Sequence, residues 1–491
     1  MKRILVILAM LVAMNASAQW QPDVRLTNNP ANSWTSLNNA WCVASSGSIV
    51  HVVWMDDRDN NKIDIYYKRS TDAGVSWGAD IRISNGISHS GSPAIAVSGD
   101  LINVVWIDNR HNNYEIYYKR STNAGISWEV DTRLTFKASG IISQYPSVAV
   151  SGSVVSVVWS DERDGNDEIY YKRSTDAGVS WGTDIRLTNN SNVSIYPSVA
   201  VFGSVVHVVW EDARDGVAKI YYKRSTDAGL NWGADTRLTF NTGYANNPSI
   251  AIYGSVVNVV WHDDRDGAGN SEIYYKRSTD AGVTWGTDTR VTYTSNTSNY
   301  PSIAASDSVI HVVWREDYAW NLQIYYIRST DGGINWGADT RLSNNILDAN
   351  CPSISISGSV VHVVWLDDRD GGNPEIYYKR NPTGNLVGVQ NISTETTSKY
   401  SLSQNYPNPF NPITNVKFSI VNSGDVKLIV YDIMGKEVQT LVNERLQPGT
   451  YEAAFDGSML NSGVYFYKLI IRHGGSSTNT FSETKKMLLI K

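Results

Sequence analysis

The sequence lacks several features that would assign it to a common class of protein. After Ala13 it contains no long apolar run, so no segment of the mature chain is expected to span a membrane. It has no excess of basic residues, because 42 Lys and Arg stand against 48 Asp and Glu, a formal net charge of −6. Nucleic acid and anionic membrane surfaces are therefore poor candidates for partners. No cysteine lies directly after the N-terminal leader, where a lipoprotein would carry its lipid-anchored residue, which argues against a lipid-anchored lipoprotein.

The first residues are typical of a secretory signal peptide. Lys2 and Arg3 precede a short apolar run, 4–13, which the small residues before Ala18 follow. We therefore predict that residues 1–18 are a signal peptide with cleavage after Ala18.

A repeated segment organises most of the chain. Residues 65–78, IYYKRSTDAGVSWG, recur letter for letter at 169–182. The pattern Ser-x-Asp-x-Gly-x-x-Trp occurs at intervals of 51 or 53 residues, once with Asn in place of Asp. The residues at its third position are Asp72, Asn123, Asp176, Asp227, Asp280 and Asp331. A period of this length indicates one supersecondary unit that is repeated.

This octet resembles the Asp-box, or BNR repeat, of the sialidase-like β-propellers. Its aspartate accepts hydrogen bonds from the following turn, and its glycine supplies a backbone conformation that other residues adopt only at a cost. The resemblance implies a propeller in which the boxes are structural clips on the face away from the ligand site.

Each unit contains four predicted strands, as 145–152, 153–160, 167–174 and 184–188 illustrate. The second-strand tryptophan occurs seven times, whereas the fourth-strand motif follows only six boxes. A seventh copy of that motif, 23–27, lies near the N-terminus. We therefore predict an all-β chain in which residues 19–380 form a seven-bladed β-propeller. The N-terminal strand closes the ring as the outer strand of the seventh blade.

The two cysteines lie near the start of the first strands of the first and seventh blades. These strands are neighbours if the ring closes, and secretion favours oxidation. We predict a Cys42–Cys351 disulfide that joins the two blades. Two free buried thiols are the alternative.

The C-terminal region has a different composition. Residues 381–404 are polar and predict a linker. The strings NYPNPFNP at 405–412, GVYFY at 463–467 and KKMLLIK at 485–491 resemble the type A sorting domain of the type IX secretion system. The resemblance implies a small Ig-like β-sandwich over residues 405–491 and the type IX secretion machinery as a partner. It also implies a secreted or outer-membrane-surface location in a Bacteroidetes-like bacterium.

Charged loops follow the second strands with the pattern Trp-x-Asp-x-Arg-Asp-Gly. The aspartates are Asp56, Asp108, Asp161, Asp212, Asp263 and Asp367, and the arginines are Arg58, Arg110, Arg163, Arg214, Arg265 and Arg369. One interpretation is a ring of charge that binds carboxylated or hydroxyl-rich sugars. The other, which we favour because the pairs recur in nearly every blade, is blade-to-blade pairing that locks the ring.

The sixth blade departs from this pattern, since its loop reads REDYAW at 315–320. Four of the 17 tryptophans lie outside the repeat, and three of these belong to the sector of blades six, seven and one. Aromatic rings beside carboxylates are suited to sugars, whose C–H faces pack on tryptophan. The ligand-binding candidates are Trp34, Trp41, Arg315, Tyr318 and Trp320. Repeat drift with loop packing is the alternative.

The sequence gives weaker support for catalysis. The sialidase resemblance would require three carboxylate-binding arginines, a Tyr–Glu pair from separate blades and an acidic Asp. The Arg-Ile-Pro motif of that family is absent, and the nearest string is RIS at 82–84. Tyr318, Glu316 and Asp317 have the right chemistry but share one loop, so they are weak catalytic candidates.

No metal site and no cofactor is expected. The histidines His51, His207, His311 and His362 occupy one position in successive units, one to a blade. They therefore do not converge on a single ion. The charged loops also lack the alternating oxygen ligands of a calcium loop.

Three functional hypotheses follow. The chain is a secreted or surface-displayed propeller that binds glycans or surface polymers without catalysis, a sialidase-like glycoside hydrolase, or a scaffold for protein interaction and adhesion. The first is favoured because nearly identical blades do not supply the different residues that one catalytic centre needs.

Overall fold

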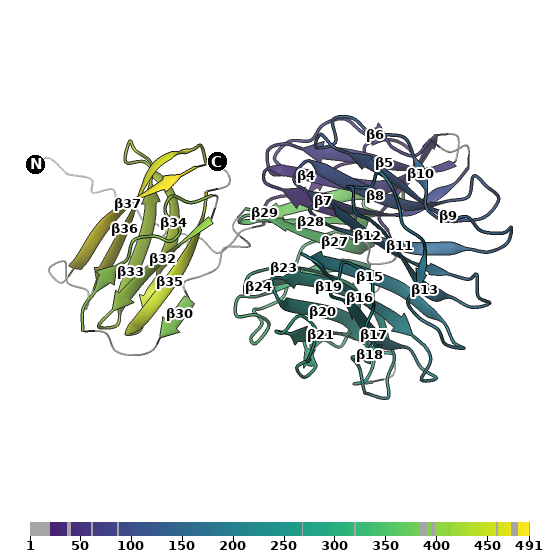
Figure 1. Cartoon of the computed structure of the whole chain (residues 1–491). Coiled ribbons are helices and arrows are strands. Elements are labelled where there is room, and N and C mark those ends of the chain that lie inside the picture. Colours follow the sequence, from purple (N-terminus) through teal and green to yellow (C-terminus); the bar gives the residue numbers. More distant parts are fainter. Residues whose placement is uncertain are drawn as a thin grey trace, which may run out of the picture.

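The computed structural model describes residues 20–490, apart from 37–40, 60–61, 86–87, 268, 319–320, 383, 385–389, 394–397, 412, 458–459 and 473–479. The predicted signal peptide therefore lies outside the described residues. Within them the chain forms strands and no helices, in two bodies that Figure 1 shows side by side. The larger body is the predicted propeller, and the smaller one follows it in the sequence.

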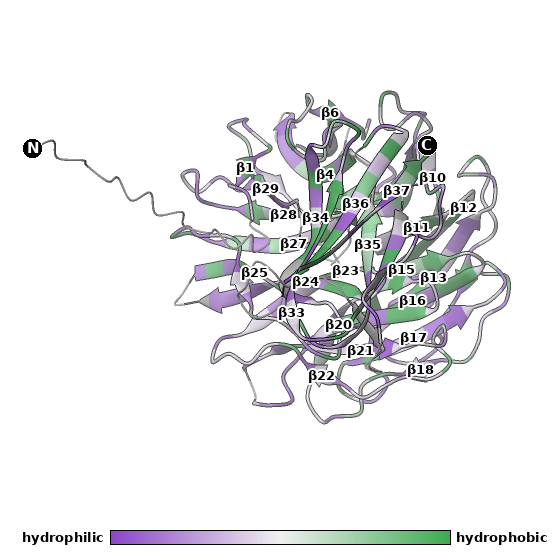
Figure 2. Cartoon of the chain, turned by 90° about the vertical axis from the view of Figure 1, so that its left-hand side faces the viewer, coloured by the Kyte–Doolittle hydropathy of each residue, from purple (hydrophilic) through white to green (hydrophobic). Residues whose placement is uncertain are grey.

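The propeller consists of seven antiparallel sheets arranged in a ring, as Figure 2 shows. Blade one contains β2 (Ser33–Trp34), β3 (Val43–Ser46), β4 (Ile49–Asp59), β5 (Lys62–Ser70) and β6 (Ile81–Arg82). Blade two contains β7 (Ser90–Ser98), β8 (Leu101–Asp108), β9 (Glu115–Ser121) and β10 (Thr132–Arg133). Blade three contains β11 (Ser143–Ser151), β12 (Val154–Asp161), β13 (Glu168–Ser174) and β14 (Ile185–Arg186). Blade four contains β15 (Ser194–Phe202), β16 (Val205–Asp212), β17 (Lys219–Ser225) and β18 (Thr236–Arg237).

The remaining blades repeat this order. Blade five contains β19 (Ala245–Tyr253), β20 (Val256–Asp263), β21 (Glu272–Ser278) and β22 (Thr289–Arg290). Blade six contains β23 (Ser298–Ser306), β24 (Val309–Tyr318), β25 (Asn321–Ser329) and β26 (Thr340–Arg341). Blade seven contains β27 (Ala349–Ser357), β28 (Val360–Asp367), β29 (Glu375–Asn381) and β1 (Val24–Arg25). The core lies between blades, where the seven second-strand tryptophans are fully buried.

The ring closes as the sequence predicts. Strand β1 from the N-terminus pairs antiparallel with β29, placing Val24 opposite Tyr378 and Arg25 opposite Tyr377. In the other blades the third and fourth strands pair in the same way, for example with Thr132 opposite Tyr118 in blade two. The seventh blade is therefore assembled from both ends of the propeller segment, which removes the free edges of an open ring.

The Asp-boxes join each blade to the blade before it. In the second box, the ring of Trp128 lies edge-on to Tyr67 of blade one, with centroids 4.9 Å apart. A Cβ atom on Gly125, whose φ is +79°, would collide with the hydroxyl of that tyrosine. The glycine is thus needed for both its backbone conformation and the close approach of the neighbouring blade. Arg69 of blade one also donates to the Ala124 carbonyl, at 2.8 Å.

The smaller body is a sandwich of two four-stranded sheets with a shared hydrophobic core. Their orders are β30-β35-β32-β31 and β34-β33-β36-β37. The strands are β30 (Gln390–Ser393), β31 (Ser401–Leu402), β32 (Ile413–Ile420), β33 (Gly424–Tyr431), β34 (Glu437–Leu446), β35 (Gly449–Asp456), β36 (Gly463–Arg472) and β37 (Thr480–Leu489). Strands β30 and β31 lie inside the segment 381–404 that its composition predicts to be a linker. Their polar composition does not predict strands, because each pairs at the edge of a sheet.

Candidate functional site

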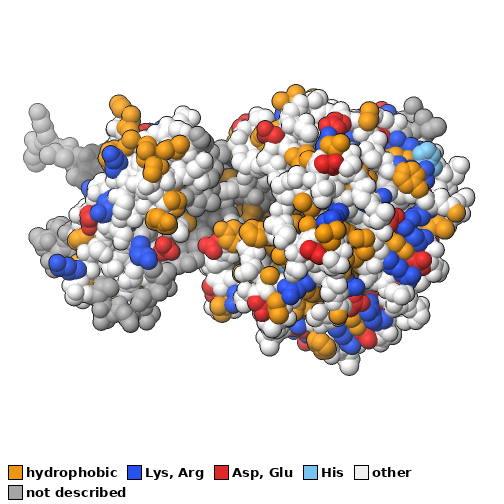
Figure 3. Space-filling view, in the orientation of Figure 1, with side chains coloured by type: hydrophobic (Ala, Val, Ile, Leu, Met, Phe, Trp, Pro, Cys, Tyr) orange, Lys and Arg blue, Asp and Glu red, His pale blue; other side chains and the backbone are white. Residues whose placement is uncertain are grey.

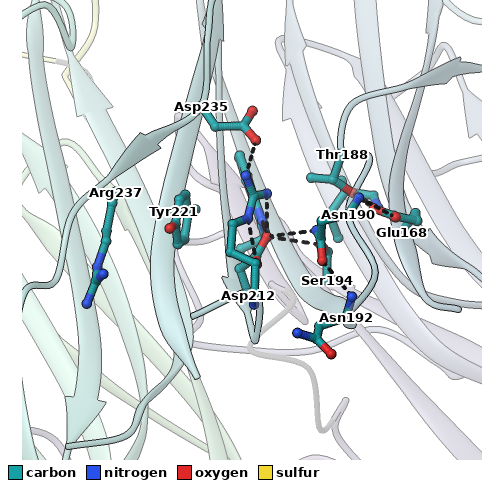
Figure 4. A network of polar contacts seen from close by, with 12 residues as sticks. Glu168, Thr188, Asn190, Asn192, Ser194, Asp212, Tyr221, Asp235 and Arg237 are labelled. Atoms are coloured by element: carbon teal, nitrogen blue, oxygen red, sulfur yellow. Dashed lines mark hydrogen bonds and ion pairs between the residues drawn. The ribbon is translucent and has the colours of Figure 1, made fainter. Parts of the chain in front are cut away.

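The charged loops of the blades are structural latches. In blade four, the guanidinium of Arg214 donates from Nε and Nη2 to the two oxygens of Asp212, at 2.8 and 2.6 Å. Its Nη1 donates to Asp235 at 2.6 Å, and its plane stacks on Tyr221. Figure 4 shows this network around Asp212. Because Asp235 precedes β18, the latch ties the second strand of a blade to the outer strand of the same blade.

This arrangement corrects the prediction that these pairs connect neighbouring blades. The lysine of the repeated IYYKR strand makes that connection, since Lys119 of blade two donates to the Ile83 carbonyl of blade one at 2.6 Å. The same lysine pairs with Asp131 of its own blade, beside the latch. On the face shown in Figure 3, acidic and basic side chains are correspondingly interspersed, with no region of one sign.

Blade six lacks the Asp–Arg latch and has an arginine, Arg315, near the axis. Glu316 is buried and takes the place of the usual aspartate, accepting from Trp314 Nε1 at 2.9 Å and from Ser298 Oγ at 3.1 Å. These contacts give Glu316 a structural role. Asp317 is half exposed and lies 3.4 Å from the Nε atom of Arg315. Arg315 is the residue directly after the second-strand tryptophan, and that position is distinctive in every blade.

We call the residue between the second-strand tryptophan and the latch carboxylate the axial position. The surrounding motif Val-Val-Trp-x-Asp is almost invariant, but x differs in all seven blades. In order around the ring the residues are Met55, Ile107, Ser160, Glu211, His262, Arg315 and Leu366. Blades three to six therefore have polar residues at this position, and blades seven, one and two have apolar ones.

A β-bulge in the first strand brings a second set of residues to the same level. The pairing register shifts there in blades two to seven, for example between Gln144 and Ser147 in blade three. The bulged residues are Ser92, Tyr145, Tyr196, Asn247, Tyr300 and Cys351, with φ between +47° and +53°. Each precedes a proline, which further disfavours this backbone conformation. Strain of this kind in an ordered strand often accompanies a functional site.

Axial side chains reach across to the bulge of the following blade. Glu211 accepts from the backbone N–H of Asn247 at 3.3 Å, and Met55 Sδ lies 3.3 Å from the Ser92 nitrogen. The ring of His262 lies 6.0 Å from that of Tyr300. Arg315 stacks on the same tyrosine, with 4.8 Å from Cζ to the ring centroid.

These contacts lie at one level of the ring, over blades three to six. The rings of Tyr145 and Tyr196 lie 4.4 Å apart and extend this set of contacts toward blade three. The axial cluster comprises Tyr145, Tyr196, Glu211, His262, Tyr300 and Arg315. It lies where the first strands begin, a few residues before Ala149, Val150 and their counterparts, which line a channel of about 240 Å³ along the axis. The cluster therefore lies toward one mouth of that channel, on the side of blades three to six.

The surroundings change the ionisation of the cluster. Burial raises the pKa of Glu211 to about 7, and the backbone N–H of Asn247, which donates to the carboxylate, offsets only part of this effect. Burial and, to a smaller extent, Arg315 lower the pKa of His262 to about 4. Burial, followed by Tyr145, raises the pKa of Tyr196 above its ordinary range. Near neutral pH the site thus contains one cation, a neutral imidazole and a carboxyl that readily exchanges its proton.

Several buried polar atoms beside the axis lack a hydrogen-bond partner within the described part of the chain, and two of them belong to the uncharged side chains at polar axial positions. They are Nδ1 of His262, whose side chain is 8% exposed, and Oγ of Ser160, whose side chain is fully buried. Buried polar groups are almost always satisfied. A ligand or water at the channel mouth is the expected source of these hydrogen bonds.

The structure separates the residues that the sequence predicts to form one site. Trp41 lines the axial channel, whereas Trp34 lines a second pocket between blades seven and one. Arg315 belongs to the axial cluster. Tyr318 ends β24, and Trp320 lies outside the described residues.

Sequence reasoning missed Tyr145, Tyr196, Glu211, His262 and Tyr300. One kind of signal could have found them, namely variation at two positions of an otherwise constant repeat, the axial position and the residue before the first-strand proline.

The predicted disulfide is not formed. Cys42 and Cys351 are both free and buried. Val43 pairs with Val52 as Val148 pairs with Val157, so Cys42 occupies the place of Ser147 in its blade. Cys351 occupies the bulge, in the place of Tyr145. The two cysteines are thus two residues out of step along neighbouring strands, and Cys42 donates its backbone N–H to Ser353 at 3.0 Å.

The histidines of the second strands are structural, as expected. His51, His207, His311 and His362 each contact the hydroxyl of a tyrosine on the third strand, at 2.7 to 2.9 Å. Among the described residues, no three His, Cys, Asp or Glu side chains are grouped as metal ligands. No helix in that part of the chain has the length and apolarity to cross a membrane.

Comparisons with known proteins agree with this architecture. A model of the BNR repeat-like domain matches residues 96–312, and a model of the secretion system C-terminal sorting domain matches residues 404–486. A search of curated proteins finds no match. The structure of polysaccharide lyase Uly1 is similar with a TM-score of 0.51 at 10% identity, over 74% of this chain and 99% of that one. This similarity concerns the fold alone.

Two glycosidases have lower scores. The α-L-arabinofuranosidase of Fusarium graminearum with arabinobiose has a TM-score of 0.43 at 13% identity, over 59% of this chain and 91% of that one. The Trypanosoma rangeli sialidase in complex with 2,3-difluorosialic acid has a TM-score of 0.41 at 11% identity, over 80% of this chain and 83% of that one.

Proposed function

We propose that this chain, which joins a sialidase-like BNR-repeat propeller to a type IX secretion sorting domain, is a glycan-binding protein that acts outside the cell. The sorting domain indicates a secreted or cell-surface location in a Bacteroidetes-type bacterium. The propeller supplies the binding site, which is the axial cluster. The ligand is a saccharide of a glycan or surface polymer.

The observation that carries this proposal is the localised loss of repeat symmetry. Seven blades keep the same tryptophan, nearly the same latch and the same buried strands, yet no two share an axial residue. Folding alone would tolerate one residue at this position in every blade. Different side chains at one mouth of a shared channel are instead what an asymmetric ligand requires.

The chemistry of the cluster fits a saccharide. Tyr145, Tyr196 and Tyr300 present aromatic rings with hydroxyl groups, which suit the C–H faces and hydroxyls of sugars. His262 and Ser160 have buried polar atoms that lack partners among the described residues. Arg315 supplies a fork of donors that favours vicinal oxygens or a carboxylate.

A glycan array with the mature full-length chain tests this proposal. We expect binding to at least one saccharide class, and a loss of about tenfold or more in Arg315→Ala and in His262→Ala. His111→Ala is the matched control, because His111 is an exposed loop histidine outside the cluster. Absence of binding to every glycan, or equal binding by all variants, would contradict the proposal.

Hydrolysis is a second candidate function, favoured by Glu211. A carboxyl with a pKa near 7 beside Tyr196 has the properties of a general acid or base. The sialidase pattern would need three carboxylate-binding arginines, and the axial cluster as described contains only Arg315. Release of 4-methylumbelliferone from a panel of its glycosides, including the sialoside, would support hydrolysis if Glu211→Gln abolished it. No turnover of any glycoside would leave the protein as a binder.

A further inference from the structure

A second pocket lies between blades seven and one, beside the axial cluster. It has a volume of about 450 Å³, and Trp34, Met55, Ile63, Leu366 and Pro374 supply its apolar lining. All five are half-buried, so their side chains remain partly accessible. A cavity of about 150 Å³ is already sufficient to bind benzene.

The pocket exists because the repeat changes at this seam. Leu366 and Met55 are axial residues of adjacent blades, and both are apolar where blades three to six have polar ones. Trp34 pairs with Met55 and occupies the place that Asn350 takes opposite Leu366 in blade seven. Loss of repeat symmetry at three neighbouring positions thus produces one apolar hollow.

One lining residue of the pocket contacts the axial cluster. Asn350 lines the pocket, and its Oδ1 accepts from Arg315 Nη1 at 3.5 Å. The lining also includes one carboxyl, Asp368. Burial, together with Asp348 and Asp367, raises the pKa of Asp368, so this environment disfavours a further negative charge. A neutral apolar group that is attached to a polar ligand fits this arrangement.

We propose that this pocket binds a neutral aromatic substituent of the glycan ligand while the axial cluster binds the sugar that carries it. An aromatic group fits better than an alkyl chain because the indole of Trp34 and the thioether of Met55 both make favourable contacts with aromatic rings. The inference rests on the proposed glycan-binding function and narrows its ligand to aryl-substituted sugars.

Matched pairs of phenyl and methyl glycosides test the pocket, with phenol as the sugar-free probe. In the mature full-length protein, we expect the phenyl glycoside to bind about tenfold more tightly than the methyl glycoside of the same sugar. Leu366→Ser copies the serine of blade three and should remove this advantage without weakening the methyl glycoside. Ile107→Ser makes the same kind of change at the axial position of blade two, outside the pocket, and should keep the advantage.

Trp34→Ala provides a second variant in case the first does not fold, and should also remove the advantage. An equal advantage in wild type and both pocket variants would overturn the proposal. So would an octyl glycoside that gains as much as the phenyl glycoside.

The outcomes also separate the pocket from the glycan-binding function. Methyl glycosides that bind without any gain from the phenyl group would refute the pocket alone. Binding of phenol that Leu366→Ser abolishes, with no binding of methyl glycosides, would refute the function and keep the pocket. No binding of any probe would refute both.

Discussion

The indole of Trp20 lies edge-on to the ring of Tyr326, with centroids 4.9 Å apart and an interplanar angle of 80°. In each of the remaining six blades the equivalent tyrosine is contacted by an Asp-box tryptophan, as Tyr275 is by Trp336 at 5.3 Å. Blade seven has no Asp-box, so a residue from the N-terminus replaces it. The N-terminal segment that closes the ring therefore provides a packing group as well as backbone hydrogen bonds.

Replacing this tryptophan should weaken the ring closure. We expect Trp20→Ala to destabilise the propeller by about 2 kcal/mol, less than a fully buried tryptophan would cost because Trp20 is half-buried. Differential scanning fluorimetry should show a fall of several degrees in Tm. Asn28→Ala, at an exposed residue of the same N-terminal segment, is the control. An unchanged Tm would show that β1 closes the ring without this contact.

The buried carboxyl of the axial cluster should make stability depend on pH. The folded-state pKa of Glu211 is raised to about 7, so the folded protein holds this proton more tightly than the unfolded chain does. Its contribution is present at low pH and is lost as the pH rises from about 4.5 through 7. Glu211→Gln should therefore gain stability relative to wild type at pH 8 but not at pH 4.5, by roughly 1–3 kcal/mol.

Thermal melts across this range would measure the effect. Glu129→Gln, at an exposed carboxylate that pairs with Arg120, is the control. Parallel curves for Glu211→Gln and wild type from pH 4.5 to 8 would contradict the assignment.

The buried histidines should make the propeller sensitive to acid. Burial lowers the pKa of His362 and of His51 to about 3, so both are neutral in the folded protein. The unfolded chain takes up these protons below about pH 6.5, and stability is lost as the pH falls from there toward 3.

Asparagine offers a natural test of this prediction. In blades two and five, asparagine replaces this histidine. Asn103 and Asn258 each accept a hydrogen bond from the hydroxyl of the equivalent tyrosine, at 2.7 Å. His362→Asn should therefore preserve the contact with Tyr378, leave stability at pH 7.5 nearly unchanged and lower the midpoint of acid unfolding. An acid midpoint equal to that of wild type would show that His362 does not contribute.

The two cysteines should be present as unreactive thiols. Burial raises the pKa of both to about 12, so almost no thiolate exists at pH 8. We expect the native protein to resist iodoacetamide, and the unfolded protein to take up two labels without prior reduction. A mass spectrum with no label until a reductant is added would restore the disulfide that the sequence suggests.

Local patterns in the sequence predict much of the fold because a propeller repeats one short-range unit. Alternating apolar residues define the strands, and the missing seventh Asp-box predicts closure by residues 23–27. Both depend on residues that are close in sequence or on a count of motifs. The sequence also indicates a structural role for the Asp–Arg loops, although it does not show that Arg214 pairs with Asp235 of its own blade.

The site depends on contacts that no local pattern contains. Glu211 contacts Asn247, and Arg315 contacts Asn350, only because axial side chains cross from one blade to the first strand of the next. The register between neighbouring strands also determines whether the two cysteines can form a disulfide. Cys42 and Cys351 differ by two residues along neighbouring strands, which separates two thiols that sequence position alone would pair. The sequence determined which residues repeat and which do not. The tertiary structure decided which of the non-repeating residues lie together, because blade-to-blade packing sets their distance in space.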